Sequence, residues 1–138
     1  MNKAKNTPND WSESRLQQEC FMFHWNGYPT KRGKLFSCPN GIPIRDQKGK
    51  HNHALAKRFK SEGLTAGVSD LILLEKGKVY FIELKKPDGK NGQSAGQKAW
   101  EKTVTEDGFP YYILNDLLVF KELIISICGR PNSKKFAV

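Results

Sequence analysis

Hydrophobic residues along this chain form short runs that polar turn segments separate. Four runs have the length and the β-branched or aromatic content of strands, at 35–37, 71–74, 79–82 and 111–114. Four other segments repeat apolar residues at helical spacing, at 12–25, 51–62, 94–107 and 116–128. The pattern predicts an α/β domain in the order helix, strand, helix, strand, strand, helix, strand, helix.

The two central runs, both of which we expect to be buried strands, form a hairpin. Lys76 and Gly77 lie at its turn, and a two-residue or a four-residue loop centred on them is equally compatible with the sequence. Both loops place Asp70 directly opposite Glu83. Cβ atoms of opposed residues in an antiparallel pair are about 4.5–5.5 Å apart. The sequence therefore predicts two carboxylates side by side.

Lys85 shares a strand face with Glu83, whereas Leu84 points to the other face. Two close carboxylates repel each other unless a cation lies between them, and hard divalent cations prefer carboxylate oxygens. With a lysine alongside, this is the arrangement of a metal-dependent phosphodiesterase. The structural alternatives are an ordinary ion pair of Glu83 with Lys85 or Lys86, and a turn-forming role for Asp70.

Glu13 is the candidate for a third oxygen at this site. It lies on the same helix face as Leu16 and Cys20, which form part of the apolar stripe. Acidic residues also favour the first turn of a helix because of the helix dipole, and Ser12 is the expected N-cap. The pattern supports both interpretations.

Gln97 stands three residues after Ser94, and Ser-x-x-Gln is a capping box. The capping box alone explains a glutamine at this position. Gln97 also leads the helix face that carries Trp100, so we expect its amide to reach the site. The two roles are compatible in one side chain.

The chain of 138 residues carries 23 Lys and Arg against 14 Asp and Glu, a formal charge of +9. Such an excess favours a polyanionic partner, such as a nucleic acid. The residues expected to contact its backbone are basic ones on the helix 51–62 and in the loop after the hairpin: Lys57, Arg58, Lys60, Lys86 and Lys90. A basic surface without a specific partner is the alternative.

The chain shows no apolar stretch of membrane-spanning length and no signal-peptide pattern, so we expect a soluble, cytoplasmic protein that does not bind membranes. The three cysteines are widely spaced, which predicts reduced thiols rather than a disulfide framework or a zinc ribbon. Residues 1–10 read as a disordered polar arm, 11–130 as the domain and 131–138 as a basic tail.

Several motifs resemble the virus-type replication-repair nuclease domain, VRR-NUC, a branch of the PD-(D/E)XK nuclease superfamily. The resemblance spans about residues 11–128. It is carried by Gly-Val-Ser-Asp at 67–70 with the strand that follows, Phe-Ile-Glu-Leu-Lys-Lys at 81–86, Gln-Lys-Ala-Trp at 97–100, Glu-Ser-Arg-Leu-Gln at 13–17 and Pro-Asn-Gly at 39–41. Ser69 stands where the superfamily name has proline. That proline shapes the backbone before the acid and is not a ligand.

The resemblance implies a restriction-endonuclease-like core, in which helices flank a central mixed β-sheet. It implies that Asp70, Glu83, Glu13 and the carbonyl of Leu84 bind Mg²⁺, for which Mn²⁺ substitutes. Asp70 and Glu83 would thereby act in catalysis, with Lys85 as the catalytic lysine and Gln97 as its polar support.

Single-domain members of the family come largely from phages and bacteria, and they are implicated as homodimers in processing branched DNA such as Holliday junctions. Members fused to other domains act on flaps. The sequence leaves other substrates open, namely linear duplex, sequence-specific sites and RNA. It also leaves open a basic DNA-binding protein that kept the fold but does not cut.

Overall fold

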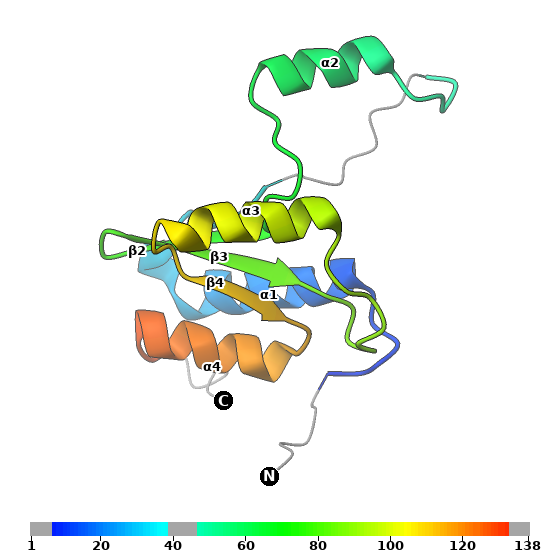
Figure 1. Cartoon of the computed structure of the whole chain (residues 1–138). Coiled ribbons are helices and arrows are strands. Elements are labelled where there is room, and N and C mark those ends of the chain that lie inside the picture. The colour runs from blue at the N-terminus through cyan, green and yellow to red at the C-terminus, as the bar shows by residue number, and fades with distance from the viewer. Residues whose placement is uncertain (1–6, 39–46, 133–138) are drawn as a thin grey trace.

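The computed structural model describes residues 7–38 and 47–132, and it confirms the predicted order of elements (Figure 1). A 3₁₀ turn, η1 (Pro29–Lys31), is the one element that the sequence pattern did not predict in this part of the chain. The helices and strands are α1 (Glu13–Gly27), β1 (Leu35–Ser37), α2 (His53–Ser61), β2 (Leu71–Glu75), β3 (Lys78–Leu84), α3 (Ala95–Glu106), β4 (Tyr111–Leu114) and α4 (Leu117–Cys128).

The strands form one mixed sheet in the order β1-β2-β3-β4. β1 with β2 and β2 with β3 are antiparallel, whereas β3 and β4 are parallel. On one face, Ile82 and Leu84 are buried in a core shared with Leu16 of α1 and Phe120 of α4. On the other face, the Phe81 ring meets Trp100 of α3 edge to face at 4.7 Å. The predicted architecture, a mixed sheet flanked by helices, is confirmed (Figure 1).

The hairpin register agrees with the prediction and selects the two-residue loop. Glu75 pairs with Lys78, and the pairing continues to Leu71 opposite Ile82. Lys76 and Gly77 have φ values of 48° and 79°, and positive φ at both central residues defines a type I′ turn. One position beyond the Leu71–Ile82 pair, the same register places Asp70 opposite Glu83.

The prediction that 71–74 is buried throughout is wrong at its end. Leu71 and Leu73 face the core, but the Leu74 side chain is 41% exposed. It points to the opposite face because side chains alternate along a strand. On that face α3 packs against β3 through Trp100 and Phe81, and it is this face that α3 covers in Figure 1.

Helix α2 lies apart from the rest of the domain (Figure 1). The Asn52 side chain caps it by accepting from the Leu55 amide at 2.9 Å. None of its residues is buried, so it contributes nothing to the core. The predicted basic helix is present, between β1 and β2.

The expected disordered arm does not extend to Thr7, which is buried. Its hydroxyl donates to Asp116 Oδ1 at 3.2 Å and accepts from the Leu117 amide at 2.7 Å. Asp116 Oδ1 in turn accepts from the Leu118 amide, as the predicted N-cap of α4. The N-terminal segment therefore completes the cap of the last helix.

Parts of three predicted segments lie outside the described residues, namely 1–6 of the arm, 39–46 of the loop after β1 with its Pro-Asn-Gly motif, and 133–138 of the tail. All three cysteines are free thiols, as predicted, although only Cys20 is fully buried. No helix within 7–38 and 47–132 combines the length and apolar character needed to cross a bilayer.

A second group of buried polar residues lies at the turn end of the hairpin. The Glu75 carboxylate forms an ion pair with Lys31 and accepts from the Cys128 thiol at 3.7 Å. Burial alone would raise the pKa of Glu75, but the Lys31 ammonium outweighs it and lowers that pKa. Nearby, His24 is buried against the Tyr28 ring, and its Nε2 has no hydrogen-bond partner in the described chain. Burial lowers the pKa of His24.

We therefore expect the contribution of His24 to stability to be lost from about pH 6.5 downward, the ordinary pKa of histidine, relative to a variant without this histidine. His24 is protonated more readily in the unfolded chain than in the folded chain. The His24 contribution to the free energy of unfolding therefore decreases as the pH is lowered through this window. The Glu75 contribution is lost at still lower pH, as pH falls below its ordinary carboxylate range. Urea unfolding of the parent and of His24→Gln between pH 7 and 5 tests this. The parent should lose more stability, by at most about 1.4 kcal/mol per pH unit, and parallel curves would contradict the assignment.

Candidate metal centre

The predicted site residues meet at one end of the sheet. Asp70 precedes the first residue of β2, Glu83 is next to last in β3, and α3 begins shortly after at Ala95. The N-terminal end of α1 lies at this same end of the domain (Figure 1). The antiparallel pairing of β2 and β3 is what brings the two acids together from positions thirteen residues apart.

Asp70 is held by the backbone of the neighbouring strand. Its Oδ2 accepts from the Leu84 amide at 2.7 Å. This bond ties one carboxylate oxygen of Asp70 to the backbone of β3. The half-buried Asp70 thus stands beside Glu83, as the hairpin register predicts.

Glu83 is a buried carboxylate, with 1% of its surface exposed. Its Oε1 accepts from Gln97 Nε2 at 2.9 Å, while its Oε2 is buried and has no hydrogen-bond donor among the described residues. Burial, and then the adjacent Asp70 carboxylate, raise the pKa of Glu83 to about 8. A buried acceptor without a donor is costly, and it needs a proton or a cation.

Gln97 has both of the roles that the sequence suggested. In the capping box of α3, its backbone amide donates to Ser94 Oγ and its Oε1 accepts from the Ser94 amide. The same Oε1 accepts from Lys85 Nζ at 2.8 Å, and Nε2 donates to Glu83. Two donors on one side and a carboxylate on the other fix the orientation of this amide.

Lys85 lies on the same face as Glu83, as predicted. Its Nζ is 3.7 Å from Glu83 Oε1, and the side chain is 12% exposed. Lys86 points elsewhere and pairs with Asp88 at 3.4 Å. The site therefore holds one ammonium, one amide and two carboxylates within a single hydrogen-bonded unit.

The donor set fits a hard divalent cation. Glu83 Oε2 lacks a partner, and Asp70 cannot supply a donor while it is ionised. Within the described residues, no three His, Cys, Asp or Glu side chains are placed to hold a metal. A cation here would have two carboxylates, and backbone or water oxygens would complete its coordination. The carbonyl of Leu84 remains the predicted backbone ligand.

Glu13 lies at the margin of this group. Partial burial raises its pKa, and the charges of Lys85 and Asp70 act on it next in strength. It is the first residue of α1, behind the N-cap Ser12, whose Oγ accepts from the Arg15 amide at 3.0 Å. The dipole interpretation therefore holds, and direct metal ligation by Glu13 remains a prediction.

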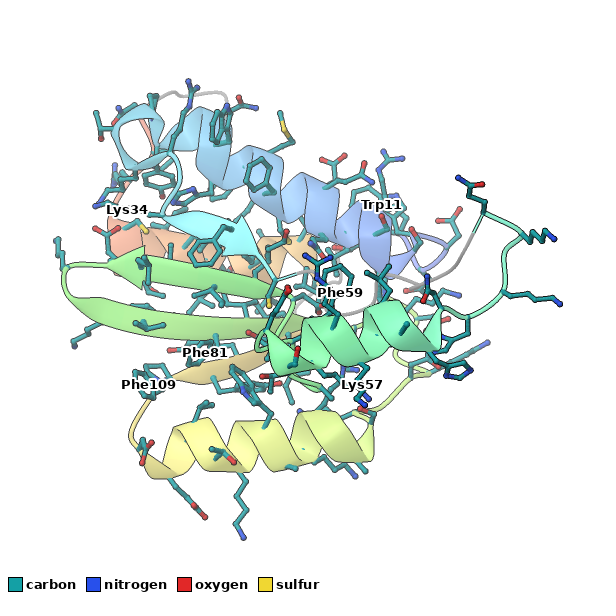
Figure 2. The ribbon with its side chains drawn as sticks, turned by 90° about the horizontal axis from the view of Figure 1, so that it is seen from above. Trp11, Lys34, Lys57, Phe59, Phe81 and Phe109 are labelled. Carbon is teal, nitrogen blue, oxygen red and sulfur yellow. The ribbon has the colours of Figure 1, made fainter. Side chains whose placement is uncertain are left out.

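The residues expected to contact DNA do not take part in the hydrogen bonds and ion pairs of the site. Lys57, Arg58 and Lys60 are exposed on α2, where Arg58 pairs with Glu62 at 2.9 Å. Figure 2 draws Lys57 and Phe59 on opposite sides of this helix. Lys90 is exposed in the loop after β3. Their contacts with DNA remain predictions.

Two side chains at the start of α1 were not singled out from the sequence. Trp11 lies two residues before Glu13, and the Arg15 guanidinium carbon lies 4.8 Å from the centre of its ring. The available signal was an aromatic residue just outside a helix that carries a candidate ligand. Such a residue is usually assigned to the hydrophobic core, and the sequence pattern alone does not distinguish a core residue from an exposed residue near a binding site.

Gly67 fixes the distance between the Asp70 strand and α3. Its φ is +86°, and a Cβ built on it would lie 2.2 Å from the Gly96 carbonyl oxygen and 2.9 Å from the Gln97 amide nitrogen. Only glycine fits there, for both conformational and steric reasons. The segment before Asp70 therefore contacts the turn of α3 that carries Gln97.

The fold matches a solved structure described as a VRR_NUC domain protein. The two share 19% sequence identity with a TM-score of 0.61, over 88% of this chain and 91% of that chain. No family model and no curated protein match the sequence. The comparison shows that this chain has the same fold as that structure, over nearly its whole length.

We expect Mn²⁺ to raise the melting temperature of the parent protein. A ligand present at ten times its Kd stabilises the fold by about 1.4 kcal/mol. Asp70→Asn keeps an acceptor for the Leu84 amide but removes one charge, so this variant should melt higher without metal and gain little from Mn²⁺. Glu106→Gln, which changes an exposed acid on α3, should respond like the parent. An equal gain in Asp70→Asn would contradict the site.

We also expect Gly67→Ala to cost more stability than Gly77→Ala. Both residues have positive φ, which costs alanine about 1–2 kcal/mol, but only Gly67 has backbone atoms in the space of the new Cβ. Displacing the start of α3 should add about 1–3 kcal/mol. Urea unfolding measures both values. Equal losses would show that the close approach is not constrained.

Proposed function

We propose that this chain is a metal-dependent nuclease of the VRR-NUC type that hydrolyses phosphodiester bonds in DNA. The observation that carries the proposal is the buried Glu83 carboxylate, whose unpaired Oε2 lies in a site shared with Asp70, Lys85 and Gln97. The fold shared with a VRR_NUC domain protein supports it, as does the resemblance of the sequence motifs around Asp70, Glu83 and Gln97 to that family.

Asp70 and Glu83 would hold Mg²⁺, and Mn²⁺ would substitute for it because both ions accept carboxylate oxygens. When bound, the cation would supply an activated water and neutralise charge on the scissile phosphate. Lys85 would orient that water and stabilise negative charge on the phosphate oxygens. Gln97 fixes the Lys85 ammonium through its Oε1, and so acts as a positioning residue.

The proposed substrate is DNA, and a branched form such as a Holliday junction in particular. The net charge of +9 favours a polyanion, and exposed lysines contact phosphates without reading sequence. A nuclease that grips only the backbone needs another feature of its substrate for selection, and branching provides one. Two copies of the chain acting as a homodimer would make paired incisions.

Cleavage of a four-way junction, a flap and a linear duplex in Mg²⁺ and in Mn²⁺ tests the proposal. We expect the parent to cut the junction, Asp70→Asn to be inactive, and Lys85→Ala to be about 10²–10³-fold slower. All three should bind the junction with similar affinity, because neither change removes a basic residue of α2. Lys102→Ala is the matched lysine control, since Lys102 pairs with Glu106 on the exposed side of α3.

The result also separates the alternatives. A parent that binds junctions but leaves every DNA uncut in both ions would be a DNA-binding protein that retains the nuclease fold. Equal cutting of junction and duplex would contradict branch selection but leave the nuclease assignment standing. If EDTA fails to stop cutting, the metal-dependent chemistry is wrong.

A further inference from the structure

Trp11 is an aromatic side chain just before α1 that the core does not use. It is only partly buried, and it is absent from the core cluster and from the hydrophobic residues that pack against that cluster. Its backbone amide donates to the Pro8 carbonyl at 3.3 Å, which positions it just before α1. Figure 2 shows Trp11 beside the N-terminal end of this helix.

The start of α1 is also the part of that helix nearest the site. Figure 1 shows the N-terminal end of α1 at the end of the domain where β3 ends, and Glu83 and Leu84 are the last two residues of β3. Trp11 lies two residues before Glu13, the first residue of α1, and so belongs to the same end of the domain. An aromatic ring in this position can reach a nucleotide that neighbours the scissile phosphate.

The Arg15 side chain lies over the ring of Trp11. Its guanidinium lies 4.8 Å from the indole centre, and its Nε is 3.3 Å from Glu19 Oε1. The Arg15 side chain is still 55% exposed, so its remaining N–H groups can meet a phosphate. Arginine and tryptophan together offer a charge for the nucleic-acid backbone and a flat surface for a base.

We propose that Trp11 and Arg15 bind an unpaired nucleotide next to the cleavage site, with the base stacked on Trp11 and its phosphate contacted by Arg15. Bases inside a duplex are already stacked on each other, so an indole gains little from them, whereas a base in a single-stranded arm is free to stack. The pair would therefore favour DNA that carries unpaired nucleotides over linear duplex. The inference rests on the proposed function, which supplies the position of the scissile phosphate.

The chain contains a matched control at the other end of α1. Arg32 lies over the ring of Trp25 at the same 4.8 Å, and Trp25 is 36% exposed. Trp25 lies twelve residues after Glu13 along α1, about 18 Å at the helical rise per residue, so it is remote from the start of the helix. Trp25→Ala removes a similar surface pair without touching the site.

The test measures binding of two DNAs in buffer without divalent cations, so that neither is cut. One is a fork with 2-aminopurine in its unpaired arm beside the junction, and the other is a duplex of equal length. Trp11→Ala and Trp11→Leu should bind the fork about 5- to 100-fold more weakly and the duplex within about twofold of the parent. Both should lose the quenching of 2-aminopurine fluorescence that stacking causes. Trp11→Phe should retain most of both signals, and Trp25→Ala should match the parent.

The inference is overturned if Trp11→Leu binds the fork as tightly as the parent, or loses affinity for fork and duplex equally, or if Trp25→Ala loses as much. Leucine fills the space of the ring without stacking, so Trp11→Leu keeps the test valid if Trp11→Ala does not fold. Cutting in Mg²⁺ is measured separately. A parent that stacks the base but never cuts would refute the proposed nuclease alone, and a parent that cuts without needing Trp11 would refute this inference alone.

Discussion

A carboxylate buried on a β-strand constrains most of this domain. Glu83 follows Ile82 and precedes Leu84, both of which belong to the apolar core, and its own oxygens face the layer between the sheet and α3. A charge in that layer is unfavourable unless every oxygen is matched. Gln97 and Lys85 approach one oxygen, while the other has no donor in the described structure and lies beside another acid. The described residues thus provide partners for only one of the two Glu83 carboxylate oxygens.

Backbone features hold the polar side chains around Glu83 in position. The capping box places Gln97 at a fixed position in the first turn of α3, and Gly67 brings the segment before Asp70 against the same turn. The Leu84 amide holds Asp70. Stability of a helix end and geometry of a polar site therefore depend on the same few hydrogen bonds. A change that loosens the start of α3 also changes the direction of the Gln97 amide.

The features that local sequence determines could be predicted. The turn at Lys76 and Gly77 fixed the hairpin register, and the register brought Asp70 to Glu83. The spacing of Ser94 and Gln97 predicted the cap of α3. These depend on residues within about fifteen positions of one another, where turn type and periodicity leave few alternatives.

Features that join distant parts of the chain could not be predicted. Thr7 caps a helix that begins 110 residues later, and nothing in a polar N-terminal segment indicates that partner. The exposure of Leu74, in a strand whose residues are all apolar up to that position, is likewise set by tertiary packing and not by the local sequence. Trp11 is similar: an aromatic residue before a helix belongs to the core in most folds, and only coordinates show that its neighbour is a guanidinium. Periodicity reports which face of an element is apolar, but not what covers that face.

Helix α2 is inserted between two strands that pair directly with each other, and none of its residues is buried. Its sequence is therefore under little selection from folding, whereas almost any substitution near Glu83 disturbs packing and polar contacts at once. Proteins of this fold could exchange this segment, or vary its length and charge, without altering the polar group around Glu83. Diversification of this kind would be expected to concentrate in the insert, which also makes α2 a suitable region for grafting a different recognition element onto the same core.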